Sequence, residues 1–471
     1  MWFCAEGRRL SAEEQASMMV RLIAEARKRF SQSFRKVLVL PPDLTRYHSG
    51  AGSLTNTLYH LLAPDARVHV IPTLGQHRPH TASENQWMFG DIPGDCIHVH
   101  DWQATAEKLG EIESQFVRLA TGGRVDRPLP VEINPLVRQG AYDLIVNIGQ
   151  VVPHEVLGFA NHNKNYFIGL GGKATISASH LIAALCGIEA NLGQIMTPLR
   201  ACYNEAERRY LHDVPDVYVL IVQTPQTDGR LATTGLYVGN DVSTYVAAAG
   251  YARQHSVSVF DQPMQKIVCF MDPKQFRSTW VTNKAIYRTR MAVADGGEIV
   301  VIAPGVERFG EQAEVDELIR TYGYRGTAHT MRALEKDAHL RAMGHAAAHL
   351  MNGSTEGRFS VTYAAGKLSR QEVEGVGFQY MDPFQALKTY NPAKMREGLN
   401  VVDGKEIYWI GSAGAGLWTA RGRFIAALRQ NATFVERIRQ TRPQNGLWGE
   451  VTRLNDLEMA SLQANHESAD Q

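Results

Sequence analysis

Short apolar runs alternate with helical segments over the first 250 residues, and this alternation constrains the fold most. Residues 11–30 have an amphipathic pattern with a serine N-cap and an acidic first turn, which predicts a helix. Strand-length apolar runs and further helical segments follow in turn, the strands at 36–40, 67–72, 95–102, 141–150 and 217–224 and the helices at 53–64 and 175–196. Strands that alternate with helices predict an α/β fold with a largely parallel sheet.

Polar side chains follow several of these strands at the point where each strand ends. They are Asp43 to Arg46, Gly75 to His77, His100 and His154. In open α/β sheets the loops at the carboxyl ends of the strands converge, and ligands bind there. We therefore expect these residues to share one cleft.

A second α/β unit begins near residues 261–273. Residues 275–305 predict a helix, a Gly-Gly turn and a buried strand, and residues 405–418 predict another strand with a small-residue loop. We expect two α/β domains with a cofactor and substrate cleft between them. The expected limits are 1–265 for the N-terminal catalytic and cofactor-binding domain, 266–395 for the C-terminal domain, and 396–471 for a strand and C-terminal helices that can return to the first domain.

Composition excludes several classes of function. Lysine plus arginine (49) against aspartate plus glutamate (48) leaves a formal charge of +1, so nothing indicates binding to nucleic acid or to an anionic membrane. The N-terminus has no apolar signal-peptide region, and no apolar run approaches the ~18 residues of a membrane span. The five cysteines are scattered without a C-x-x-C pair, which argues against a disulfide framework and a thiolate zinc site. We expect a cytoplasmic protein.

Three common motifs are not matched. The GLGGKAT run lacks the glycine and the serine or threonine of a phosphate loop, because Phe167 and Ala174 occupy those positions. No G-x-G-x-x-G follows the first strand, and His154-Glu155 lacks the second histidine of a zinc protease motif, where Gly158 stands. The glycines before Lys173 can still admit a phosphate to the start of the next helix, with a tight turn as the equal alternative.

The segment from Val151 to His180 concentrates histidine, lysine, glycine and asparagine directly after the expected strand at 141–150. Polar, glycine-rich chain at the exit of a strand indicates a site, although a long solvent loop is the alternative. His154 is followed ten residues later by Lys164, and sixteen residues after that by His180.

With two motifs upstream, this spacing resembles the lactate racemase family, whose members use a nickel-pincer nucleotide. The sequence DLTR, from Asp43 through Thr45 to Arg46, resembles the family's D-x-T-R motif. The sequence GQHRP at 75–79, with Thr81 after it, resembles G-x-H-R-P-x-T. The three motifs occur in the family's order, and the resemblance extends over residues 36–310.

The resemblance implies how the cofactor is held. This cofactor is nickel with pyridinium-3-thioamide-5-thiocarboxylic acid mononucleotide, and other enzymes make it. Lys164 resembles the lysine that attaches covalently to it through a thioamide, which requires a partly desolvated amine beside a carbon electrophile. His180 resembles the protein ligand of nickel, and a neutral imidazole suits this metal. Asp43 and Thr45 are implied as cofactor-binding residues, with orientation of Arg46 as a further role for Asp43.

The resemblance also implies the roles of the remaining residues. His77 and His154 resemble the two catalytic acid–bases, because inversion of a carbinol needs a proton acceptor on each side and histidine titrates near working pH. Arg46 resembles the residue that binds the substrate carboxylate, and Lys284 resembles a substrate-binding lysine of the second domain. The reaction implied is racemisation or epimerisation by proton-coupled hydride transfer, in a site closed against water.

The sequence departs from the family around the anchor lysine. Where lactate racemases carry small residues and an arginine, this chain has Asn161, His162 and Asn163, and Trp280-Val281 replace a tyrosine-glutamine pair before Lys284. Additional polar groups suit a substrate with more hydroxyls than lactate. We therefore expect Asn161 and His162 to bind substrate, with a structural role for His162 as the equal alternative, and we expect a D-gluconate/D-mannonate 2-epimerase.

Other functions stay open at this point. A free aldose epimerised at C2, or a small 2-hydroxy acid such as lactate or malate, would use the same cofactor. A nickel or cofactor carrier would need Lys164 and His180 but not two flanking histidines. A zinc hydrolase would bind metal without a covalent adduct.

Overall fold

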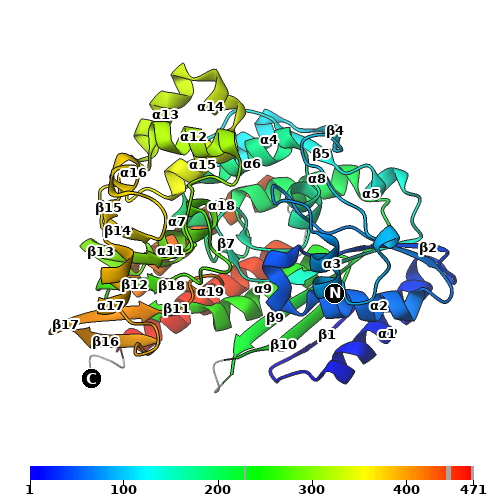
Figure 1. Ribbon diagram of the computed structural model, residues 1–471. Helices are drawn as coiled ribbons and strands as arrows, with labels where there is room; N and C mark the ends of the chain where they lie inside the picture. The colour runs from blue at the N-terminus through cyan, green and yellow to red at the C-terminus, as the bar shows by residue number, and fades with distance from the viewer. Residues whose placement is uncertain (227–229, 442–446, 468–471) are drawn as a thin grey trace. The chain divides into compact units, whose positions relative to one another are not determined.

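The computed structural model describes residues 1–226, 230–441 and 447–467. The chain forms two compact units, each made of several segments (Figure 1). The first unit contains Met1–Ala178, Ile195–His255 and Phe434–Leu454, and the second contains Ser179–Gln194, Ser256–Thr433 and Asn455–Gln471. The domain limits expected from the sequence, at 265/266 and 395/396, stay a prediction.

The first unit is built on a six-stranded sheet in the order β1-β10-β9-β6-β2-β3. The four strands from β9 to β3 are parallel. Strand β10 pairs antiparallel with β9, and β1 pairs antiparallel with β10 at the edge of the sheet (Figure 1). The bounds are β1 (Phe3–Glu6), β2 (Lys36–Leu40), β3 (Arg67–Val70), β6 (Leu144–Gln150), β9 (Asp216–Pro225) and β10 (Leu231–Gly239). Strand β6 is buried along its whole length, as an apolar strand inside a parallel sheet should be.

Helices cover this sheet. In α1 (Ala12–Arg29) the capping box of Ser11 and Glu14 fixes the first turn, and Met19, Leu22 and Ala26 are buried at helical spacing. The other elements of this unit are α2 (Ala51–Leu62), α3 (Ala82–Phe89), α4 (Ser114–Ala120), α5 (Leu136–Gln139), α8 (Pro198–Tyr210), α9 (Val242–Ser256), the hairpin of β4 (Glu107–Ile112) and β5 (Leu129–Ile133), and the first turns of α6 (Lys173–Cys186). Gly187, at φ +94°, separates α6 from α7 (Ile188–Asn191), so the helix expected at 175–196 is interrupted.

The prediction of a strand at 95–102 is wrong. Only Ile97 forms an isolated bridge to Val70, after a 3₁₀ turn η2 (Gly94–Cys96). Val99 is 55% exposed, so the apolar run has no second buried face to hold it in the sheet.

The second unit contains a six-stranded sheet in the order β15-β14-β13-β12-β17-β16, parallel except for β16. Its strands are β12 (Met264–Phe270), β13 (Val293–Ala303), β14 (Ser360–Ala365), β15 (Gln379–Tyr380), β16 (Gly398–Val402) and β17 (Lys405–Ile410), beside a parallel pair of β11 (Val257–Phe260) and β18 (Leu417–Ala420). The α/β class with largely parallel sheets is confirmed.

Most remaining helices belong to the second unit. They are α10 (Thr279–Thr282), α11 (Lys284–Thr289), α12 (Ala313–Tyr322), α13 (Thr327–Lys336), α14 (Ala338–Ala342), α15 (Gly344–Asn352), α16 (Arg370–Gly375) and α17 (Pro383–Thr389). The long helices α18 (Arg421–Thr441) and α19 (Leu447–Glu467) contribute residues to both units. Among the described residues, no helix combines the length and the apolar character that a membrane span requires.

Candidate active site

Three loops of the first unit leave neighbouring parallel strands at the same edge of the sheet. Asp43 follows β2, His77 follows β3, and His154 follows β6, and β2 lies between the other two strands. Parallel strands place their carboxyl ends together, so the sheet order positions these loops side by side.

Asp43 and His77 form a hydrogen-bonded pair. Asp43 is buried, and one of its carboxylate oxygens accepts from Nδ1 of His77. The other oxygen accepts from the backbone N–H of Thr45 at 3.1 Å and from its hydroxyl at 2.5 Å. Burial disfavours the charged carboxylate, but the attraction to His77 when that ring is protonated, with hydrogen bonds from His77 and Thr45, outweighs it, so the pKa of Asp43 lies well below its usual range. The pair is therefore an aspartate–histidine dyad.

Asp43 also begins the next element. It caps the 3₁₀ helix η1 (Leu44–Ser49), which carries Thr45 and Arg46, and the N–H of Leu44 donates to Nε2 of His80 at 2.9 Å. The side chain of Asp43 bonds to His77 and Thr45. The cofactor-binding roles predicted for Asp43 and Thr45 stay predictions.

Arg46 and Lys164 share one electrostatic environment. Burial, with the positive charge of Arg46, lowers the pKa of Lys164 to about 8. Burial also lowers the pKa of Arg46, and the carboxylates of Asp43 and Glu155 act in the opposite direction on both cations. Glu155 was not selected from the sequence, although it directly follows His154.

The chain that leads to Lys164 folds inward. After the hairpin of β7 (Pro153–His154) and β8 (Gly158–Phe159), Asn161 and His162 adopt positive φ angles of 72° and 60°. The side-chain oxygen of Asn161 accepts from Asn165 at 2.8 Å, and the buried His162 ring stacks on Tyr218 with centroids 3.9 Å apart. These contacts favour the structural alternative for His162. Substrate binding by Asn161 and His162 stays a prediction.

Arg200, on α8, hydrogen-bonds to three residues of this loop. Its guanidinium donates to the carbonyl oxygens of Phe159 at 2.7 Å and Asn161 at 3.1 Å, and to the side-chain oxygen of Asn163 at 2.5 Å. Arg200 is fully buried and lies over the ring of Tyr245 at 4.2 Å. We call Phe159–Asn163 with Lys164 the anchor loop. No sequence motif pointed to Arg200.

Two acidic residues, Glu207 and the buried Asp216, lie next to the anchor loop. Glu207 accepts from Asn163 at 2.9 Å and from the Tyr218 hydroxyl at 2.5 Å, and Asp216 accepts from the Tyr166 hydroxyl at 2.8 Å. Burial, with the negative charge of Glu207, raises the pKa of Asp216 to about 8, and burial raises the pKa of Glu207. At neutral pH this pair holds at least part of a proton.

The glycines before α6 make a tight turn. Glu132 accepts from the backbone N–H groups of Ala174 at 2.9 Å and Thr175 at 3.3 Å, so a carboxylate already occupies the start of the helix. A Cβ on Gly172 would lie 2.4 Å from the same carboxylate, which explains a glycine there. These contacts favour the tight turn over a phosphate site at this helix start.

The second unit holds two of the predicted site residues. His180 is half-buried on α6, with Nδ1 3.5 Å from the Ser179 hydroxyl. Lys284 is the half-buried first residue of α11, and the ring of Trp280, four positions before it, packs at a tilt against His349 with centroids 4.5 Å apart. Within the described ranges, no three His, Cys, Asp or Glu side chains gather as a metal site.

His100 has a structural environment. Its Nε2 bonds to the carbonyl oxygen of Gly171 at 3.1 Å, and its Nδ1 lies 3.1 Å from Asn134. Asp101 instead accepts from the N–H groups of the following turn. His100 is therefore a buried residue of the core, and its closest hydrogen-bond partners are Gly171 and Asn134, not the other residues expected in the cleft.

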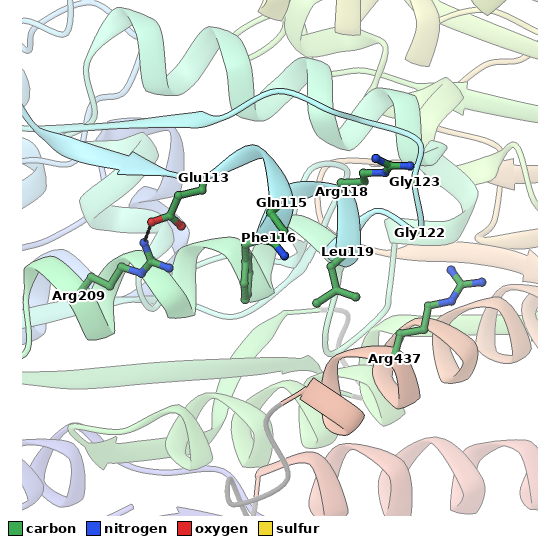
Figure 2. Close-up of a pocket in the computed structure, with 9 residues that line it drawn as sticks. All are labelled: Glu113, Gln115, Phe116, Arg118, Leu119, Gly122, Gly123, Arg209 and Arg437. Carbon is green, nitrogen blue, oxygen red and sulfur yellow. Dashed lines mark hydrogen bonds and ion pairs between the residues drawn. The ribbon is translucent and has the colours of Figure 1, made fainter.

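A separate pocket of about 1040 Å³ lies in the first unit around α4 and contains none of the predicted site residues. Figure 2 shows Arg209 and Glu113 joined as an ion pair, while Arg437 projects toward Gly122. The lining residues are Glu113, Gln115, Phe116, Arg118, Leu119, Gly122, Gly123, Arg209 and Arg437.

Residues 12–192 match the family model described as the lactate racemase N-terminal domain. This stretch contains every predicted site residue except Lys284. Over this stretch, the chain is similar to the N-terminal domain of lactate racemases.

Solved structures extend the likeness in fold beyond the lactate racemase N-terminal domain. A crystal structure of a protein from Thermotoga maritima is 23% identical, with a TM-score of 0.74, and the match covers 88% of this chain and 99% of that chain. The lactate racemase apoprotein from Thermoanaerobacterium thermosaccharolyticum is 14% identical, with a TM-score of 0.63, and the match covers 86% and 92%. No curated protein sequence matches significantly.

Proposed function

We propose that this protein is a nickel-pincer nucleotide-dependent epimerase that inverts C2 of a 2-hydroxy acid. The observation that carries the proposal is the Asp43–His77 dyad on η1 and the β3 loop, in one electrostatic environment with Arg46 and Lys164. A base, a carboxylate-binding cation and a nucleophilic amine are the groups this chemistry requires from the protein.

The residues present fit the cofactor by their chemistry. Lys164 is a half-buried amine whose pKa is lowered to about 8, so a substantial fraction is neutral and nucleophilic near pH 8. We propose that Lys164 holds the pyridinium ring covalently and that the His180 imidazole binds nickel. When bound, the cofactor would supply a reversible acceptor for the carbinol hydride.

The chain's own residues then bind substrate and move protons. The Arg46 guanidinium binds the carboxylate, and Lys284 supplies a second cation for the carboxylate or a hydroxyl. His77 takes the hydroxyl proton, and the charged Asp43 stabilises the imidazolium that forms. His154 serves the opposite epimer.

We propose a sugar acid, the D-gluconate/D-mannonate pair, as substrate, with cofactor-making enzymes as the upstream partners. Asn161 and His162, which suggested a hydroxyl-rich substrate, are buried in this structure, so direct comparison of substrates is required. The panel is gluconate, glucose, lactate and malate, followed by NMR for formation of the second epimer.

The deciding experiment combines mass and turnover on protein from cells that express the cofactor-making enzymes. The intact mass should show a nucleotide adduct that Lys164→Ala loses, and the loaded protein should convert gluconate to mannonate. An adduct without epimerisation of any panel member would favour a cofactor carrier, while metal without an adduct would favour a hydrolase. Exclusive turnover of lactate or malate would overturn the sugar-acid assignment alone.

A further inference from the structure

The two candidate acid–base histidines differ in what their Nδ1 atoms contact. Nδ1 of His77 faces the Asp43 carboxylate, while Nδ1 of His154 faces the backbone N–H of Val156 at 3.2 Å. The Asp43 carboxylate is a hydrogen-bond acceptor for Nδ1 of His77, whereas the Val156 N–H is a donor to Nδ1 of His154. A neutral imidazole carries one proton, so each contact selects one tautomer.

For His77 the selection follows from Asp43. The carboxylate accepts at both oxygens, from His77 at one and from Thr45 at the other. The low pKa of Asp43 keeps it ionised, so it has no proton to donate and Nδ1 of His77 must carry the shared hydrogen. In the neutral ring the lone pair of His77 is then on Nε2, in a side chain that is 37% exposed.

His154 is held in the opposite tautomer. Val156 is two residues later in the turn between β7 and β8, and its N–H donates to Nδ1. The neutral ring must therefore hold its proton on Nε2. A proton on Nδ1 would place two hydrogens against each other and would break this contact.

We propose that His77 and His154 rest in opposite tautomers, and that Asp43 is the positioning residue that sets His77 as the resting proton acceptor. The functional meaning rests on the proposed epimerase activity, but the tautomers do not. When His77 acts, the substrate O–H bond breaks, an Nε2–H bond forms, and the imidazolium shares its Nδ1 proton with Asp43. The epimer whose hydroxyl faces His154 reacts only after that ring gives up its contact with Val156.

The test is ¹⁵N NMR of histidine side chains in the full-length protein without cofactor, with ¹⁵N-histidine labelling. His77→Gln and His154→Gln assign the two rings. The expected result is Nδ1–H for His77 and Nε2–H for His154. The same tautomer in both rings, or the reversed pair, overturns the proposal whether or not the protein is an epimerase.

Asp43→Asn tests the positioning role. The asparagine amide can donate to Nδ1, so His77 should change to the Nε2–H form, and in loaded enzyme kcat should fall by ~10³–10⁴-fold, as expected for the wrong tautomer. Asp43→Glu should restore the Nδ1–H signal and part of the activity. The exposed Asp126→Asn is the matched control and should change neither. An unchanged His77 signal in folded Asp43→Asn contradicts the proposal, and thermal unfolding identifies a variant that is not folded.

Discussion

The guanidinium of Arg200 donates a 2.5 Å hydrogen bond to the side-chain oxygen of Asn163, the residue directly before the anchor lysine. The same guanidinium donates to the carbonyl oxygens of Phe159 and Asn161, so one buried cation fixes most of the anchor loop. Left-handed backbone at two consecutive non-glycine residues is unfavourable, and it persists only where surrounding contacts determine it. Arg200 supplies those contacts.

Replacement of Arg200 should therefore destabilise the protein strongly. Arg200→Met removes the donor of three buried acceptors, and we expect a loss of about 3–5 kcal/mol in the free energy of unfolding. Urea denaturation measures it. Arg208→Lys, at an exposed arginine of the same helix, is the control and should cost less than about 1 kcal/mol. Equal losses in the two variants would contradict the role of Arg200.

The reactivity of Lys164 should depend on pH with a midpoint near 8. Its pKa is lowered by burial and by Arg46, so the amine is protonated and unreactive below this pH and neutral above it. Acetic anhydride labelling of the cofactor-free protein, read by peptide mass, gives the midpoint. Arg46→Gln removes a positive charge and should move the midpoint upward. A midpoint near that of an ordinary lysine, ~10.4, would show that the site does not activate Lys164.

Asp216 should make the protein less stable as pH rises through neutrality. Its pKa is about 8 in the folded protein and about 3.9 in an unfolded chain, so the folded state binds more protons between these values. Stability from this group is complete below pH ~4 and declines until about 8. Asp216→Asn should flatten the profile of unfolding free energy between pH 5 and pH 9. The exposed Asp213→Asn should leave that slope in place, and no difference between the two variants would refute the assignment.

Replacement of either His77 or His154 should stop turnover without preventing attachment of the cofactor to Lys164. In loaded protein, His77→Gln and His154→Gln should each abolish epimerisation while the adduct mass on Lys164 remains, because neither ring forms the covalent bond. His100→Gln should instead lower thermal stability, since His100 is buried and bonds to the Gly171 carbonyl and to Asn134. Retained activity in His77→Gln would remove it from the reaction.

The sequence was sufficient to predict which residues lie at the carboxyl edge of the sheet. It was not sufficient to predict which of their side chains contact each other. The apolar runs of β2, β3 and β6 are contiguous and strand-length, and polar residues follow each one, so Asp43, His77 and His154 were expected together. The dyad itself depends on which strands are neighbours, and sequence order alone does not give that.

The anchor loop shows what sequence reasoning missed. Polar side chains at Asn161 and His162 suggested contact with substrate, yet positive φ angles turn both inward. Asparagine and histidine are enriched in the left-handed region, but neither residue requires it, so the local sequence does not determine those angles. Arg200 lies 37 positions after Asn163, on another helix, and carries no motif.

Deuterium at C2 of gluconate tests the central claim most directly. Loaded enzyme is incubated with 2-²H-gluconate in ordinary water, and the mannonate formed is analysed by NMR and mass spectrometry. Transfer of hydride out and back predicts mannonate that keeps its deuterium, with no such product from Lys164→Ala. Mannonate that has exchanged its deuterium for solvent hydrogen, or equal turnover by Lys164→Ala, would contradict a cofactor-dependent hydride transfer.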